Sequence, residues 1–214
     1  MKLVILDRDG TINVDRDDYV KSPDEWQPLP GALEAIARLN HAGWHVVIAT
    51  NQSGLGRGLF DMASLNAIHA KLNLALAHVG GRIDAIFFCP HSATDACVCR
   101  KPQPGLFEQI GLRYGVDLKT VATLGDSLRD LQAGAAAGCE PHLVRTGKTV
   151  GLDAAGLDAL VQQVPGTRVH DDLAAFAEFM ISRERSRRAA AKAEGAPRSA
   201  DEGVLDSGPG DLSS

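Results

Sequence analysis

Carboxylates and a hydroxyl stand at the ends of short apolar runs in this sequence. Asp7 and Asp9 follow the first run, Thr50 ends the second, Asp126 follows a later one, and Lys101 precedes a segment with a helical pattern. Carboxylate oxygens suit Mg²⁺, which keeps several waters and shares the oxygens of a phosphate substrate. Around one crevice, side chains of these types predict a site for a hard cation beside a site for an anion.

The apolar runs alternate with stretches in which apolar residues recur every three or four positions, as in an amphipathic helix. In chain order, we expect strands at 3–6, 45–50, 85–89, 121–125 and 141–144, and helices at 32–41, 63–79, 106–114, 128–137 and 171–182. Strands that alternate with helices form right-handed βαβ units. The sequence therefore predicts an α/β fold with a doubly wound parallel sheet, in which ligands bind beyond the carboxyl ends of the strands.

Length and composition limit the class of protein. The chain has 214 residues, of which 44% are hydrophobic and 23% charged, and its formal net charge is −5. We expect one domain over residues 1–182 and a disordered tail over 183–214, because the composition of that tail cannot bury a core. No apolar run approaches the roughly 18 residues of a membrane span, the first run meets charged residues too early for a signal peptide, and the negative charge argues against nucleic acid as a partner. We expect a cytoplasmic protein that acts on a small molecule, and a monomer because no long apolar stripe is evident.

Three of the four cysteines lie close together in the sequence. Cys89 and His91 form one pair and Cys97 and Cys99 a second, with a short spacer between them. Two such pairs can wrap a tetrahedral zinc ion, and four protein ligands leave no open position for water, which is typical of a structural site. The alternative is a set of reduced cysteines with His91 on the surface. The fourth, Cys139, is expected to be a small buried residue.

The combination of motifs resembles the phosphatases of the haloacid dehalogenase superfamily over residues 3–145. The residues that carry the resemblance are Asp7-x-Asp9-Gly10-Thr11, Thr50, Lys101 and Gly125-Asp126-x-x-x-Asp130. It implies a Rossmann-like fold, here with a minimal cap because no large insertion follows the first or third motif. It also implies that Asp130 supports Lys101 or the metal.

The resemblance further implies hydrolysis in two displacements. Asp7 would attack phosphorus to form an aspartyl-phosphate, and Asp9 would protonate the leaving oxygen and later accept a proton from water. Thr50 and Lys101 would bind the oxygens of the transferred phosphoryl group. Mg²⁺ would be held by Asp7, the backbone carbonyl of Asp9 and Asp126, and would screen the nucleophile from the phosphate charge.

Within this superfamily, the stretch Cys-Pro-His…Cys-x-Cys-Arg-Lys-Pro is similar to the histidinol-phosphate and heptose-bisphosphate phosphatase group. For that group, the residues implied to bind substrate are Asp15, Arg16, Asp17, Asp18, Asn51, Gln52, Ser53, Arg100 and Ser127. Arg100 would recognise the distal phosphate, since a guanidinium matches an oxyanion with two parallel hydrogen bonds. A larger polar residue is common in the group where this chain has Ser127.

The motifs around Asp7 and Thr50 are most similar to those of the heptose-bisphosphate members. This implies removal of the 7-phosphate from a heptose 1,7-bisphosphate on the route to ADP-heptose and the lipopolysaccharide core. A histidinol-phosphate phosphatase is the alternative, because Asp15, Asp17 and Asp18 can face a cationic amine. A nucleic-acid 3′-phosphatase would need a basic surface. A phosphate-binding or zinc-bearing module without activity would be inert towards every phosphate ester.

Overall fold

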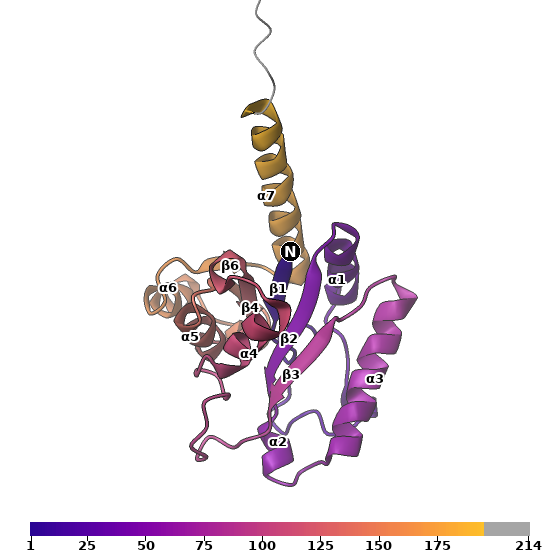
Figure 1. Cartoon of the computed structure of the whole chain (residues 1–214). Coiled ribbons are helices and arrows are strands. Elements are labelled where there is room, and N and C mark those ends of the chain that lie inside the picture. Colours follow the sequence, from indigo (N-terminus) through magenta and orange to yellow (C-terminus); the bar gives the residue numbers. More distant parts are fainter. Residues whose placement is uncertain (195–214) are drawn as a thin grey trace, which may run out of the picture. The chain divides into compact units, whose positions relative to one another are not determined.

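The structure, a computed structural model, describes residues 1–194, and Met1–Ile181 form one compact unit. Six parallel strands make one sheet in the order β3-β2-β1-β4-β5-β6 (Figure 1). The strands are β1 Leu3–Leu6, β2 His45–Asn51, β3 Ala85–Cys89, β4 Ala122–Gly125, β5 Glu140–Val144 and β6 Arg168–His170. The predicted α/β fold with a parallel sheet is confirmed.

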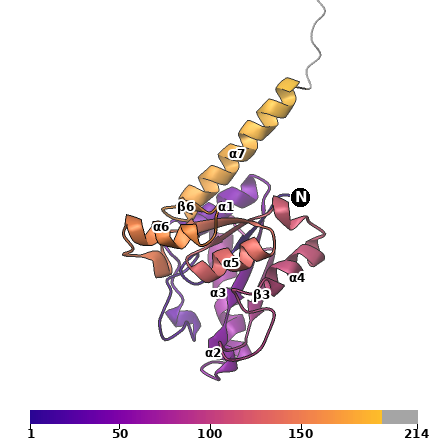
Figure 2. The same ribbon diagram turned by 90° about the vertical axis from the view of Figure 1, so that its left-hand side faces the viewer.

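Helices cover both faces of the sheet. They are α1 Ala32–His41, α2 Ser53–Gly56, α3 Met62–His78, α4 Gly105–Tyr114, α5 Leu128–Ala136, α6 Ala154–Gln162 and α7 Leu173–Glu194, with 3₁₀ turns η1 Pro23–Glu25, η2 Leu118–Thr120 and η3 Gly147–Thr149. Successive side chains of a strand point to opposite faces, so Val4 and Leu6 pack in one core with α1, α3 and the start of α7. Leu3 and Ile5 pack in a second core with α4 and α5. Figure 2 looks onto the side that carries α5 and α6.

The strand order creates the crevice that the fold needs for a ligand. β1 pairs with β2 on one side (Leu6 opposite Ile48) and with β4 on the other (Leu6 opposite Leu124). From β1 the chain continues to β2 on one side, and from β4 it continues to β5 on the other side. The connections that begin at the carboxyl ends of β1 and β4 therefore run in opposite directions and leave a crevice between them. The segments after β1, β2 and β4 meet at this place.

Apart from the short helix α2 and the 3₁₀ turns, β6 and α6 are the elements of the domain that were not predicted. β6 is only three residues long and two of them are exposed, so it has no apolar run and is defined by its pairing with β5 (His142 opposite Arg168). α6 has a single buried residue, Leu157, and is capped by Asp153, whose side chain accepts from the Gly156 amide. Neither element carries the strong periodicity on which the prediction depended.

The last helix is longer than expected. α7 continues through the basic cluster to Glu194, although the helix was predicted to end at residue 182 and a disordered tail to begin at 183. Residues 182–194 belong to a second unit, and there Arg188 Nε donates to Glu184 Oε1 at 2.7 Å, one helical turn apart. Arg, Glu, Lys and Ala are strong helix formers, so this stretch is helical without a core. The rest of the predicted tail, 195–214, lies outside the described residues. No helix within residues 1–194 has both the length and the apolar content to cross a membrane.

Candidate active site

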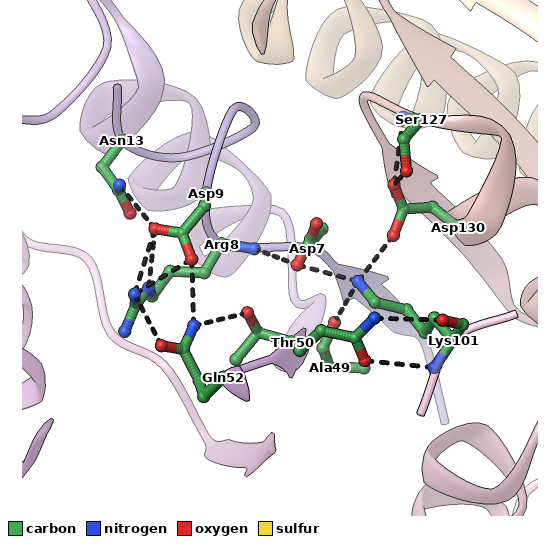
Figure 3. A network of polar contacts seen from close by, with 11 residues as sticks. Asp7, Arg8, Asp9, Asn13, Ala49, Thr50, Gln52, Lys101, Ser127 and Asp130 are labelled. Carbon is green, nitrogen blue, oxygen red and sulfur yellow. Dashed lines mark hydrogen bonds and ion pairs between the residues drawn. The ribbon is translucent and has the colours of Figure 1, made fainter. Parts of the chain in front are cut away.

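A buried ammonium group joins two carboxylates at the centre of the crevice. Lys101 Nζ lies 2.8 Å from Asp7 Oδ1 and 2.5 Å from Asp130 Oδ1, and donates to the Ala49 carbonyl at 2.8 Å (Figure 3). Burial alone would lower the pKa of Lys101, but the charges of Asp130 and Asp7 raise it above its ordinary value. Lys101 is therefore held as a cation beside the first strand.

The end of β2 sets the position of this lysine. The Asn51 side chain donates to the Lys101 carbonyl at 3.1 Å and accepts from the Lys101 amide at 3.0 Å. The amide nitrogen and the amide oxygen of Asn51 are thus both hydrogen-bonded to the backbone of Lys101. The structure places Asn51 as a support for Lys101, and its predicted contact with substrate stays a prediction.

Three carboxylates converge next to Lys101. One oxygen each of Asp7, Asp126 and Asp130 lies within 4.8 Å of the others. Burial raises the pKa of Asp7, as does the charge of Asp130, although Lys101 opposes both. Burial likewise raises the pKa of Asp126, and the charges of Asp130 and Asp7 add to it. A divalent cation bound by oxygen ligands relieves this repulsion, so the group fits Mg²⁺.

Two glycines surround Asp126. A Cβ atom at Gly10 would lie 2.1 Å from Asp126 Oδ2, and one at Gly147 would lie 2.0 Å from the same oxygen. Both glycines have positive φ, +77° and +56°, which other residues rarely adopt. The same oxygen accepts the backbone N–H of Lys148 at 2.7 Å. Backbone from the loops after β1 and β5 therefore approaches this carboxylate closely.

Asp9 faces a different set of partners from Asp7. Both of its oxygens accept from Arg8 Nη2, at 3.0 and 2.9 Å, and it also accepts from Asn13 and from Gln52, each at 2.9 Å (Figure 3). Burial favours the protonated form, but the Arg8 charge and these hydrogen bonds lower the pKa of Asp9 below its ordinary value. In this arrangement Asp9 is ionised. The Gln52 amide also donates to Thr50 Oγ1 at 3.0 Å, so Gln52 links Asp9 to Thr50.

A cavity of about 240 Å³ opens above these groups. Of the predicted active-site residues, those that line it are Asp7, Asp9, Asp15, Arg16, Asp17, Thr50, Asn51, Gln52, Ser53, Arg100, Lys101, Asp126, Ser127 and Asp130. Asp18 is not among them, and its exposed carboxylate pairs with Arg16 and Lys21.

Two cations that the sequence analysis did not single out also line the cavity, Arg129 and Lys148. Lys148 Nζ lies 2.8 Å from Asp15 Oδ2 and 3.0 Å from Asp17 Oδ1 and so joins the loop after β1 to the turn after β5. Both could have been predicted from their position, because each lies within four residues of the carboxyl end of a strand.

The cysteine loop, residues 89–99, brings its four candidate ligands together. Cys89 Sγ lies 3.8 Å from Cys97 Sγ and 3.2 Å from Cys99 Sγ, and His91 Nδ1 lies 3.5 Å from Cys89 Sγ and 3.3 Å from Cys99 Sγ. Tetrahedral coordination with Zn–S bonds of about 2.3 Å separates two sulfurs by about 3.8 Å. The Cys89–Cys97 distance equals this value and the Cys89–Cys99 distance is shorter, so the four side chains lie close enough to share one zinc ion. Cys139 is buried, as predicted, and is not part of this group.

This loop packs directly against the start of α4. The Gly105 amide donates to the Val98 carbonyl at 3.0 Å, and a Cβ at Gly105 would lie 2.4 Å from that oxygen. Arg100 Nη1 donates to the His91 carbonyl at 3.2 Å. The loop therefore fixes the segment that carries Arg100 and Lys101.

Comparisons with known proteins agree with this geometry. A family model described as haloacid dehalogenase-like hydrolase matches residues 6–138. Over 183 residues the chain is 60% identical to a protein of Bordetella bronchiseptica named D-glycero-beta-D-manno-heptose-1,7-bisphosphate 7-phosphatase, covering 85% of this chain and 98% of the relative. A Pseudomonas aeruginosa protein of the same name is 51% identical over 180 residues, covering 84% and 97%.

A solved structure of a protein with the same activity in its name also resembles this chain. The crystal structure of D,D-heptose 1,7-bisphosphate phosphatase from B. bronchiseptica, complexed with magnesium and phosphate, superposes with a TM-score of 0.79 at 59% identity. The superposition covers 86% of this chain and 99% of the other.

Proposed function

Because this chain belongs to the haloacid dehalogenase-like hydrolases, we propose that it removes the 7-phosphate from D-glycero-D-manno-heptose 1,7-bisphosphate. The observation that carries the proposal is the placement of Asp7, the predicted nucleophile, against the Lys101 ammonium inside a cavity of small-molecule size. The names of two relatives that match nearly their whole length supply the substrate. The product would serve a cytoplasmic route to ADP-heptose and the lipopolysaccharide core.

The chemistry follows from the partners of Asp7 and Asp9. An oxygen of Asp7 forms a bond to phosphorus as the ester P–O bond breaks, and the leaving sugar oxygen takes a proton from Asp9. Water then attacks the aspartyl-phosphate, gives its proton to Asp9 and releases inorganic phosphate. The ionised Asp9 described above suits this second step, and proton uptake prepares it for the first. Lys101 and Thr50 are placed to bind the oxygens of the phosphoryl group.

The three converging carboxylates make Mg²⁺ the proposed cofactor. Asp7 and Asp126, with the backbone carbonyl of Asp9, would hold the ion, and Asp130 offers a third carboxylate at the same place. When bound, the ion neutralises charge between the nucleophile and the phosphate. The related B. bronchiseptica enzyme was crystallised with magnesium and phosphate, which supports the same assignment here.

The structure also bears on the alternative substrates. In a histidinol-phosphate enzyme, the acidic loop after β1 would meet a cationic amine. Here Asp15 and Asp17 already pair with Lys148, and Asp18 pairs with Arg16 and Lys21, so three cations of the chain already face these three carboxylates. The net charge of −5 supports a small molecule over nucleic acid.

Side-by-side phosphate release with Mg²⁺ tests the proposed function. The substrates are heptose 1,7-bisphosphate, histidinol phosphate and a 3′-phosphorylated oligonucleotide. We expect a large preference in kcat/KM for the heptose, with one phosphate retained on the sugar. A preference for either other ester would overturn the proposed substrate and leave the roles of Asp7 and Asp9 intact.

We further propose that the cysteine loop binds one structural zinc ion. Replacing Cys97 and Cys99 by Ser is expected to abolish zinc binding and to lower the Tm by on the order of 10 °C, because the four ligands close a loop that has few apolar contacts of its own. Native mass spectrometry of protein purified without chelator measures the zinc, and a thermal melt measures the Tm.

The matched control for this loop is Cys139→Ser, which changes a buried cysteine outside the group and should keep a full equivalent of zinc. Wild-type protein without zinc, or a double variant that still holds it, would contradict the assignment.

A further inference from the structure

The first turn of α5 contributes Ser127, Arg129 and Asp130 to the cavity, and the first and last of these are already engaged with each other. The Ser127 hydroxyl donates to Asp130 Oδ2 at 2.5 Å, and the Ser127 amide donates to the same oxygen at 3.0 Å. This capping pair fixes the start of the helix and holds the Asp130 carboxylate that pairs with Lys101. The Ser127 hydroxyl can therefore donate to a substrate phosphate only by giving up the hydrogen bond to Asp130 that orders the site.

Arg129, by contrast, is exposed and has no such hydrogen bond. Within residues 1–194 its guanidinium forms neither a hydrogen bond nor an ion pair. It lines the active-site cavity, and it also lines a second cavity of about 390 Å³ beside the cysteine loop. Arg100 lines the same two cavities from the opposite segment.

The other cations that line the cavity are already paired with carboxylates, so Arg100 and Arg129 are the ones available to bind a remote anion. Lys101 pairs with Asp7 and Asp130, Lys148 pairs with Asp15 and Asp17, and Arg16 pairs with Asp18. Arg100 forms no ion pair in the described part of the chain, and its hydrogen bond is to the neutral His91 carbonyl. An acidic neighbour of Arg100 is Asp95, which also lines the second cavity and whose pKa is lowered mainly by the Ser92 amide and in smaller part by the Arg100 charge. Within residues 1–194, two guanidinium groups with no carboxylate at ion-pair distance thus border the place where the active site opens.

We propose that Arg129 is a specificity-determining residue whose guanidinium, together with that of Arg100, binds the phosphate that the reaction leaves on the sugar. This inference rests on the proposed function. A guanidinium donates two parallel hydrogen bonds to a phosphate, and two such groups around one dianion strengthen its binding without touching the reacting phosphorus. Arg129 then selects a bisphosphate over a monophosphate.

The test compares two substrates that differ only at the remote phosphate: heptose 1,7-bisphosphate and heptose 7-phosphate. For Arg129→Gln we expect kcat/KM for the bisphosphate to fall roughly 10- to 100-fold, through KM, and kcat/KM for the monophosphate to stay within about twofold of wild type. Arg129→Lys should recover part of the loss. The control is Arg113→Gln, which changes an exposed arginine of α4 outside both cavities and should leave both substrates unaffected.

The outcomes separate this inference from the proposed function. The inference is overturned if wild type hydrolyses the bisphosphate and Arg129→Gln changes kcat/KM for neither substrate. It is also overturned if the variant lowers kcat/KM for both substrates equally, and Arg129 then has a structural role. If wild type prefers a different ester, the proposed function fails and the inference fails with it. The Arg129→Lys variant keeps the test decisive if the glutamine variant folds poorly.

Discussion

Asp7→Asn is expected to reduce phosphate release by at least about 1,000-fold in kcat. An amide has the shape of the carboxylate but is a poor nucleophile towards phosphorus, so the covalent step is lost. The Lys101–Asp130 pair is untouched, and one of three converging carboxylates is removed, so the variant should stay folded and at least as stable as wild type. Phosphate release in the presence of Mg²⁺ measures the first effect, and urea unfolding measures the second.

The matched control is Asp24→Asn, which neutralises an exposed carboxylate outside the active-site cavity and should keep wild-type activity. If Asp7→Asn retained activity within tenfold of wild type, another group would have to be the nucleophile.

Lys101→Met is expected to damage stability and activity together. Its ammonium is 2% exposed and neutralises both Asp7 and Asp130, so its removal leaves uncompensated buried charge, which costs about 3–5 kcal/mol. Activity should fall by at least about 100-fold, because a donor to the phosphoryl oxygens is lost. Urea unfolding gives the free energy of unfolding, and phosphate release gives the rate.

A second substitution separates the two effects. Adding Asp130→Asn to Lys101→Met should restore part of the stability, since it removes one unpaired charge, but should not restore activity. Lys119→Met, at an exposed lysine, serves as the control. A Lys101→Met variant as stable as wild type would contradict the view that Lys101 balances these carboxylates.

The sequence predicted well what depends on local pattern. Apolar runs followed by Asp7 and Asp126 identified buried parallel strands with carboxylates at their ends, and the topology of such sheets brings those ends together. The four candidate ligands of the cysteine loop could also be predicted from the sequence, because their spacing within eleven residues limits how they can be arranged.

What the sequence did not reveal depends on contacts between distant segments. The pairing of Lys148 with Asp15 joins residues that are 133 positions apart, and no local pattern encodes it. Likewise, the contact of Asp9 with Gln52 results from the packing of β1 beside β2. The helix beyond residue 182 was missed for a different reason: a composition that cannot form a core can still have high helix propensity.

The close approach of Gly10 and Gly147 to Asp126 also constrains how this sequence can diverge. A side chain at either position must push away the same carboxylate oxygen, so the two sites are energetically coupled although they are 137 positions apart. The two glycines also lie against each other, since a Cβ at Gly147 would lie 2.6 Å from Gly10 Cα, so the free-energy effects of the two alanine substitutions should not add. Neither position can then change independently of the other as long as the carboxylate of Asp126 keeps its present place.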